Sequence, residues 1–152
     1  HIDQSLFART ILDEKNGPPP EVNLFNEKNN GETLLNLIDK NYIKSAHDIS
    51  LGGLLTAVSK MCIKGNKGIK LKSSKNLLSD IEYFFAEDQG RYIIEIRAEK
   101  LKEVSQILDK NSVHYEELGV IIEDNMIIND KTKVTVDELK SFYTKWFKNY
   151  MN

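Results

Sequence analysis

The chain has 152 residues, of which 29% are charged and 40% are hydrophobic, and its formal net charge at pH 7 is -2. This composition is typical of a soluble globular protein and fits neither a disordered segment nor a membrane protein. Because Lys and Arg are spread along the chain and form no basic stripe, nucleic acid is not expected as a partner.

The spacing of apolar residues predicts helices and strands that alternate after a short N-terminal helix. Apolar residues at helical spacing indicate helices, and runs rich in β-branched and aromatic residues indicate strands. In chain order we expect a helix over 3–12, a linker over 16–20, a helix over 22–42 interrupted near 29–31, a strand over 44–49, a helix over 54–63, a strand over 69–72, a helix over 74–83, a strand over 91–96, a helix over 99–109, strands over 115–122, 126–128 and 133–136 with a tight turn at 123–125, and a closing helix over 137–148. These elements predict an α+β fold in which a mixed β-sheet packs with helices.

The domain organisation follows from the breaker run Asn16 to Pro20, which is the one segment that reads as a linker. No repeat of fixed period accompanies it. We therefore expect residues 1–20 to form a helical arm and linker, and residues 21–152 to form one compact domain.

A turn over residues 46–54, where a strand leads into a helix, holds the densest group of glycine and polar residues. Amide groups at a helix N-terminus lack partners and carry partial positive charge, and glycines let an oxygen ligand approach closely, so the turn suits an anion. Two adjacent glycines also begin helices and permit close packing without any ligand. Both interpretations stay open.

The polar residues of this turn leave similar alternatives. His47 and Asp48 suit acid–base chemistry or the orientation of a ligand, and they equally suit a core histidine beside a helix-capping residue. Ser50 lacks the Gly-x-Ser-x-Gly elbow of a hydrolase nucleophile, and the chain contains no P-loop motif. Those two enzyme classes are therefore excluded.

A second polar group, Glu87, Asp88, Gln89 and Arg91, lies just before the strand over 91–96. A loop there would aim several polar groups at one spot. The alternative is a charged turn in which Glu87 or Asp88 pairs with Arg91, a contact worth about 0–1 kcal/mol when exposed. The carboxylates are too few for a metal site, and the remaining histidines have no companions at ligand spacing.

Three further features bear on the setting of the protein. Cys62 is the only cysteine, lies in an apolar helical pattern and is expected to be a small buried hydrophobe. The chain has no apolar run of about 18 residues and does not begin with a signal-peptide pattern, so we expect a cytoplasmic protein without a membrane partner. Phe142, Trp146 and Tyr150 either form the core face of the closing helix, which we favour, or dock a partner.

Two segments together resemble one known family. Residues 45–54, Ser-Ala-His-Asp-Ile-Ser-Leu-Gly-Gly-Leu, and residues 85–92, Phe-Ala-Glu-Asp-Gln-Gly-Arg-Tyr, are similar in order and separation to the C-terminal domain of the phosphoribosylformylglycinamidine synthases, within the aminoimidazole ribonucleotide synthetase superfamily. Residues 1–6 and 17–20 resemble the join from the preceding half of such an enzyme. The chain departs from the family pattern at Leu51, where an acid or small polar residue is usual, and at Val120, where Glu is usual.

The resemblance implies part of an ATP-dependent carbon–nitrogen ligase. In that reaction of purine biosynthesis the formyl amide oxygen of formylglycinamide ribonucleotide is phosphorylated, and ammonia from a glutaminase then displaces phosphate to give the amidine. ATP and Mg²⁺ serve the full enzyme, whose partners are the preceding domains, a glutaminase subunit and a small accessory subunit. The catalytic histidine and the magnesium carboxylates belong to the other half, so the chain is expected to hold no catalytic or metal residue, to bind no cofactor tightly and to be inactive alone.

The same resemblance implies roles for the two polar groups. Ser50, Gly52 and Gly53 would contact a phosphate, and His47 and Asp48 would line the cleft. Glu87, Asp88, Gln89 and Arg91 would give polar support.

Two alternatives remain. The first is the C-terminal domain of another superfamily member, such as a thiamine-phosphate kinase, a selenophosphate synthetase or a hydrogenase-maturation protein, although the Glu-Asp-Gln-Gly-Arg segment argues against it. The second is a non-catalytic docking module that uses the arm around Leu6, Phe7 and Ile11 and the tail at Trp146 and Phe147.

Overall fold

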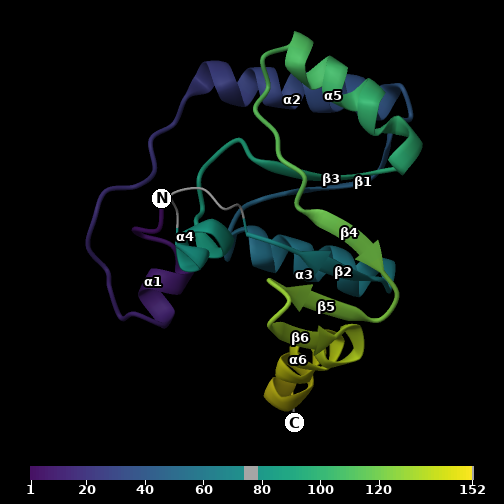
Figure 1. Cartoon of the computed structure of the whole chain (residues 1–152). Helices are drawn as coiled ribbons and strands as arrows, with labels where there is room; N and C mark the ends of the chain where they lie inside the picture. The colour runs from purple at the N-terminus through teal and green to yellow at the C-terminus, as the bar shows by residue number, and fades with distance from the viewer. Residues whose placement is uncertain (74–78, 152) are drawn as a thin grey trace. The chain divides into compact units, whose positions relative to one another are not determined.

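The computed structural model describes residues 1–73 and 79–151, and these form two compact units. Unit 1 comprises His1–Ala57 and Phe85–Glu116, and unit 2 comprises Val58–Phe84 and Glu117–Asn152. The elements labelled in Figure 1 are, in chain order, α1 (Leu6–Thr10), α2 (Leu24–Asp39), β1 (Ile43–Asp48), α3 (Gly53–Gly65), β2 (Gly68–Leu71), α4 (Asp80–Phe85), β3 (Tyr92–Ile96), the 3₁₀ turn η1 (Ala98–Lys100), α5 (Leu101–Lys110), β4 (Gly119–Ile122), β5 (Asn125–Ile128), β6 (Thr132–Thr135) and α6 (Val136–Met151).

Unit 1 is built on the antiparallel pair β1 and β3, in which Asp48 lies opposite Tyr92. Helices α2 and α5 lie side by side along this pair (Figure 1). Their contact is a small core of Leu37, Val104 and Leu108, in which the last two lie one helical turn apart on α5 and so face the same way. This core fixes α2 relative to the strands.

Unit 2 contains a four-stranded sheet in the order β4-β2-β5-β6. Strand β2 runs parallel to β5 and antiparallel to β4, so the sheet is mixed. The buried side chains Leu71 and Met126 come from the two parallel strands at its centre. The turn at 123–125 joins β4 to β5, yet these strands do not form a hairpin because β2 lies between them.

Helix α6 begins with a reciprocal cap. The hydroxyl of Thr135 accepts a hydrogen bond from the amide of Glu138 at 3.1 Å, and the Glu138 carboxylate accepts one from the amide of Thr135 at 2.8 Å. These bonds stabilise the ionised carboxylate and lower the pKa of Glu138. The sequence Thr-Val-Asp-Glu therefore sets the start of α6 at the end of β6.

The predicted α+β class, with a mixed sheet and packed helices, is confirmed. The interruption near 29–31 is wrong, because α2 is continuous from Leu24 to Asp39. The side chains of Asn29 and Asn30 donate to the carbonyl oxygens of Asn111 and Gly90, at 2.7 and 3.0 Å, so these apparent breakers tie the helix to its neighbours. The predicted helix over 74–83 is observed only as α4, and its residues 74–78 lie outside the described residues.

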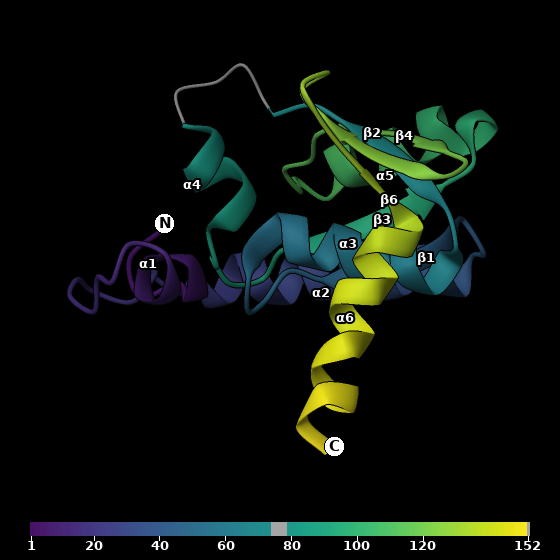
Figure 2. The same cartoon turned by 90° about the horizontal axis from the view of Figure 1, so that it is seen from below.

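Two predictions about single side chains have opposite outcomes. Cys62 is buried, as expected, and burial raises the pKa of its thiol, which disfavours the reactive thiolate. The prediction that Phe142, Trp146 and Tyr150 face the core is wrong, since their exposed fractions are 75%, 68% and 76%. Figure 2 shows the C-terminal half of α6 with no other element of unit 2 beside it.

Among the described residues, none of the helices has the length and apolar character that a membrane span requires.

Gly68 provides a test of how tightly the sheet of unit 2 is assembled. It begins β2, and a Cβ placed on it would overlap the main chain of Asn125, with the carbonyl carbon of Asn125 only 2.6 Å away. We expect Gly68→Ala to destabilise the chain by about 2 kcal/mol or more, because packed backbone does not yield. The measurement is the urea midpoint followed by circular dichroism at 222 nm.

Gly65→Ala is the matched control, since a Cβ on Gly65 meets nothing within 4 Å and the residue ends α3. It should leave stability unchanged or raise it by about 0.5 kcal/mol. Equal midpoints for the two variants would contradict the close approach of β2 to Asn125.

Candidate functional site

The turn that leads into α3 is held by a carboxylate of the same chain. One oxygen of Glu87, Oε1, accepts hydrogen bonds from the amide of Gly52 at 2.8 Å and from the amide of Leu6 at 2.8 Å. The amide of Gly53 donates to the carbonyl oxygen of Ser50 at 2.9 Å. All these residues belong to unit 1. The two amides expected to receive a phosphate therefore already have acceptors.

Glycine is required at this turn for its conformation. Gly52 and Gly53 have φ angles of +87° and +70°, in the left-handed region that side chains disfavour. A Cβ on Gly52 would also overlap the side chain of Thr56. The Glu87 carboxylate satisfies an otherwise unpaired amide beside the positive end of α3. A phosphate could bind the Gly52 amide only by displacing Glu87, and the Gly53 amide only by displacing the Ser50 carbonyl oxygen.

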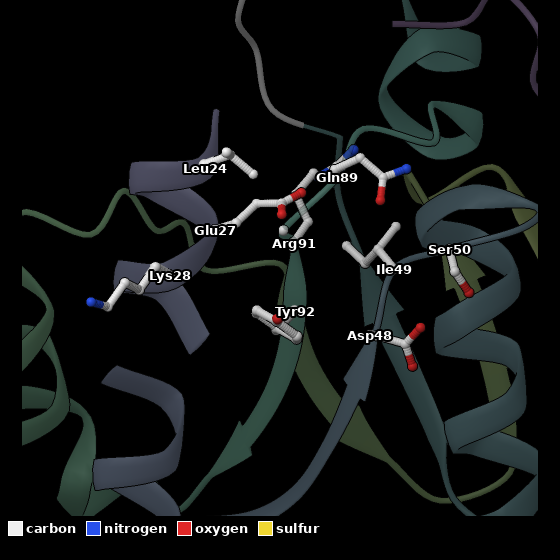
Figure 3. Close-up of a pocket in the computed structure, with 10 residues that line it drawn as sticks. Leu24, Glu27, Lys28, Asp48, Ile49, Ser50, Gln89, Arg91 and Tyr92 are labelled. Atoms are coloured by element: carbon white, nitrogen blue, oxygen red, sulfur yellow. The ribbon is translucent and has the colours of Figure 1, made fainter. Parts of the chain in front are cut away.

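A pocket of about 530 Å³ lies in unit 1 between α2 and the adjoining ends of β1 and β3 (Figure 3). The amide of Ile49 donates to the carbonyl oxygen of Arg91 at 2.9 Å, which extends the strand pairing into the segments that line the pocket. The lining residues are Leu24, Glu27, Lys28, Asp48, Ile49, Ser50, Gln89, Gly90, Arg91 and Tyr92.

Helix α2 approaches this pocket closely because residue 90 is a glycine. Gly90 has a φ angle of +66°, and a Cβ on it would lie 2.8 Å from Cγ of Glu27. The side chain of Asn30 donates to the Gly90 carbonyl oxygen at 3.0 Å. The approach places Glu27 and Lys28 opposite the polar residues of the strand ends.

The pocket has a mixed charge. Lys28, Arg91, Glu27 and Asp48 all line it, although the Lys28 amine points away from the other labelled side chains (Figure 3) and lies 3.7 Å from Oε1 of Glu32. Arg91 also pairs with Asp88, with 3.2 Å between its guanidinium nitrogen and the carboxylate. The side chain of Tyr92 is 41% exposed. Such a lining offers both hydrogen-bond donors and acceptors, together with an aromatic ring, to a polar organic ligand.

His47 is placed by its neighbour. Its ring nitrogen Nδ1 lies 2.6 Å from the carbonyl oxygen of Asp48, so Nδ1 carries a proton and donates to that oxygen. The same nitrogen lies 3.4 Å from Oδ1 of Asp48. His47 does not line the pocket. It is oriented as a structural residue of β1.

The structure brings together only part of the predicted site. Asp48, Ser50, Gln89 and Arg91 line one pocket, whereas Gly52 and Glu87 meet in a hydrogen bond outside that lining. Asp88 bonds to Arg91, as the charged-turn interpretation expected. The pocket residues that sequence reasoning missed are Leu24, Glu27 and Lys28 of α2, together with Ile49, Gly90 and Tyr92.

A magnesium site does not fit the donors present. Magnesium prefers carboxylate oxygens in octahedral geometry. Throughout the part of the chain that the structure describes, no three His, Cys, Asp or Glu side chains are grouped so as to hold a metal ion.

The family follows from sequence and fold together. Residues 4–130 match the family described as "AIR synthase related protein, C-terminal domain". The chain belongs to this family.

Curated relatives of the chain carry the name of a synthase subunit. The chain is 64% identical over 151 residues to "Phosphoribosylformylglycinamidine synthase subunit PurL" of Pelagibacter ubique, with 99% of this chain and 21% of that protein covered. It is 38% identical over 151 residues to the subunit of the same name from Bartonella bacilliformis, with 99% and 20% covered. The chain thus spans about a fifth of the length of these relatives.

Solved structures show the same fold at lower identity. The structure of T. maritima PurL complexed with FGAR superposes with a TM-score of 0.73 at 23% identity, covering 88% of this chain and 24% of that chain. The structure of T. maritima PurL complexed with ATP gives a TM-score of 0.65 at 23% identity, covering 74% and 21%.

The bridging carboxylate of Glu87 can be tested by its removal. We expect Glu87→Ala to lower the free energy of unfolding by about 2 kcal/mol, because hydrogen bonds to a charged acceptor contribute about 1.5–3 kcal/mol and two amides lose their acceptor. The measurement is urea denaturation followed by circular dichroism.

Gln89→Ala is the control, since Gln89 is a neighbouring exposed residue. It should change stability by less than about 0.5 kcal/mol. If Glu87→Ala is as stable as this control, the bridge contributes nothing to the fold.

Proposed function

We propose that the chain is the C-terminal domain of a phosphoribosylformylglycinamidine synthase. In this role it takes part in the ATP-dependent conversion of formylglycinamide ribonucleotide and glutamine-derived ammonia to the amidine. The observation that carries the proposal is 64% identity across 99% of the chain with a subunit of that name. This relationship favours the synthase over the thiamine-phosphate kinase and selenophosphate synthetase alternatives, which share only the superfamily.

The contribution of unit 1 would be one wall of a ligand site. Asp48, Ser50, Gln89 and Arg91 would supply polar contacts from the pocket. The glycine turn would act through its shape, since its amides are already bonded.

The remaining predicted site residues would position this wall. Glu87 fixes the turn, Asp88 orients Arg91, and His47 holds the end of β1. None of them would touch the reacting atoms, so the chain would supply no catalytic residue.

Other parts of the assembly follow from the relatives. Structures of T. maritima PurL complexed with ATP, ADP and AMPPCP support ATP as the nucleotide, and Mg²⁺ would be held outside this chain. A T. maritima assembly named PurLQS supports further subunits as partners, and the family resemblance implies that these are a glutaminase and a small accessory subunit. The full enzyme would be cytoplasmic, and the chain alone would be inactive because the other half of each cleft is missing.

A chimera tests the function directly. The homologous segment of the Pelagibacter ubique subunit is replaced by this chain, and the product is assayed with glutaminase and accessory subunits for ATP-dependent amidine formation. We expect kcat/KM within about tenfold of the parent, since interfaces between homologous domains are largely retained. A subunit with the segment deleted should be inactive.

The decisive negative result is a chimera that is soluble and melts like the parent but forms no amidine. That result would show that the chain does not serve this reaction.

The isolated chain should bind no phosphate at the turn before α3. Because Glu87 and the Ser50 carbonyl accept from the Gly52 and Gly53 amides, added phosphate, ATP or formylglycinamide ribonucleotide should leave the melting temperature unchanged. The measurement is a thermal-shift titration, with sodium chloride at equal ionic strength as the control. A saturable rise with phosphate alone would contradict the assignment of these amides to internal acceptors.

A further inference from the structure

The feature that the proposed function leaves unexplained is one face of α6. Positions repeating every three to four residues share a helix face, and here that face is aromatic. Its residues, which we call the α6 aromatic face, are Phe142, Tyr143, Trp146, Phe147, Tyr150 and Met151.

These side chains lie in water. Their exposed fractions run from 60% to 76%. Trp146 stacks on Tyr150, with 5.8 Å between ring centroids and 11° between planes, which orders two of the rings side by side. The five aromatic residues together expose roughly 700 Å². The largest apolar patch of a typical monomer is about 300–600 Å², and one side of a stable interface is about 800 Å², so the α6 aromatic face has the size of an interface.

The position of α6 in the sequence bears on what covers this face. The match to the family domain ends at residue 130, before α6 begins at Val136. The similarity to the Pelagibacter ubique subunit nevertheless covers 99% of the chain, and that subunit is about five times as long. Helix α6 therefore belongs to the longer protein while lying outside the matched domain.

Charge argues against a second copy of the chain as the occupant. Residues 139–151 contain three lysines and no acidic residue. Pairing two such segments would bring lysines together, and the two acids at the start of α6 are already engaged, Asp137 with Lys140 at 3.7 Å and Glu138 with the amide of Thr135 at 2.8 Å, so the pairing costs free energy. A surface with apolar residues bordered by carboxylates is the complement that this helix requires.

We propose that the α6 aromatic face packs against another part of the same synthase polypeptide, on an apolar surface bordered by acidic side chains. This inference rests on the proposed function only in taking the chain as part of a synthase. In this arrangement α6 holds the domain against the rest of the subunit.

The test compares hydrogen exchange of residues 139–151 in the isolated chain and in the chimeric subunit. We expect exchange in the chimera to be at least about tenfold slower, because packing suppresses local opening of the helix. Exchange at the same rate in both would overturn the proposal, even if the chimera forms amidine. Slower exchange in an inactive chimera would support the packing while removing the proposed function, so the two failures are distinguishable.

A pair of variants adds a readout that does not depend on activity. Trp146→Ser should leave the melting temperature of the isolated chain within about 1 °C of the wild type, since Trp146 is exposed there, and should lower that of the chimera by about 3 °C or more. Lys145→Ser, on the opposite face of α6, is the control and should lower neither. Equal effects of Trp146→Ser in both proteins would overturn the proposal.

Two other outcomes would assign the face to a different occupant and overturn the proposal. Protection in the isolated chain that rises with its concentration would indicate a second copy. Protection of the isolated chain by vesicles containing phosphatidylserine, with none in the chimera, would indicate a membrane surface.

Discussion

The arrangement of unit 1 depends on one carboxylate. Glu87 accepts from the amides of Leu6 and Gly52 at 2.8 Å each, and so joins the N-terminal arm, the turn before α3 and the segment before β3. These three segments are distant in sequence, and one carboxylate links them by direct hydrogen bonds. The polar residues that follow Glu87 reach the pocket because this carboxylate holds their segment in place.

The same interaction occupies the anion-binding position that the glycine turn would otherwise offer. A helix N-terminus with adjacent glycines is a site where anions bind, and here the anion is a side chain of the chain itself. The open polar surface of unit 1 is the neighbouring pocket, where Arg91 lies among the carboxylates of Glu27 and Asp48. The balanced charge of this lining is consistent with the proposed role of the pocket as one wall of a ligand site.

The sequence predicted most elements because their apolar periodicity is strong, as in α5 and β3. It failed where tertiary contacts override local preference. Asn29, Asn30 and Gly31 resemble a break, but side-chain bonds to Asn111 and Gly90 keep α2 continuous. Half of the candidate site was predicted from the sequence, because the residues after β1 and before β3 form polar clusters. Glu27 and Lys28 look like ordinary surface residues of a helix in the sequence. They line the pocket because Gly90 allows that helix to approach closely. The periodicity of α6 shows that one face of the helix is apolar, but it does not show what covers that face. A core face is therefore the expectation from sequence.

Trp146 is the only tryptophan of the chain, and it lies on the exposed face of α6. An indole that is already in water in the native state has nearly the same emission after unfolding. Tryptophan fluorescence of this protein therefore reports little on the loss of either compact unit. The emission of Trp146 changes instead when another surface packs against α6. Trp146 therefore reports association separately from folding.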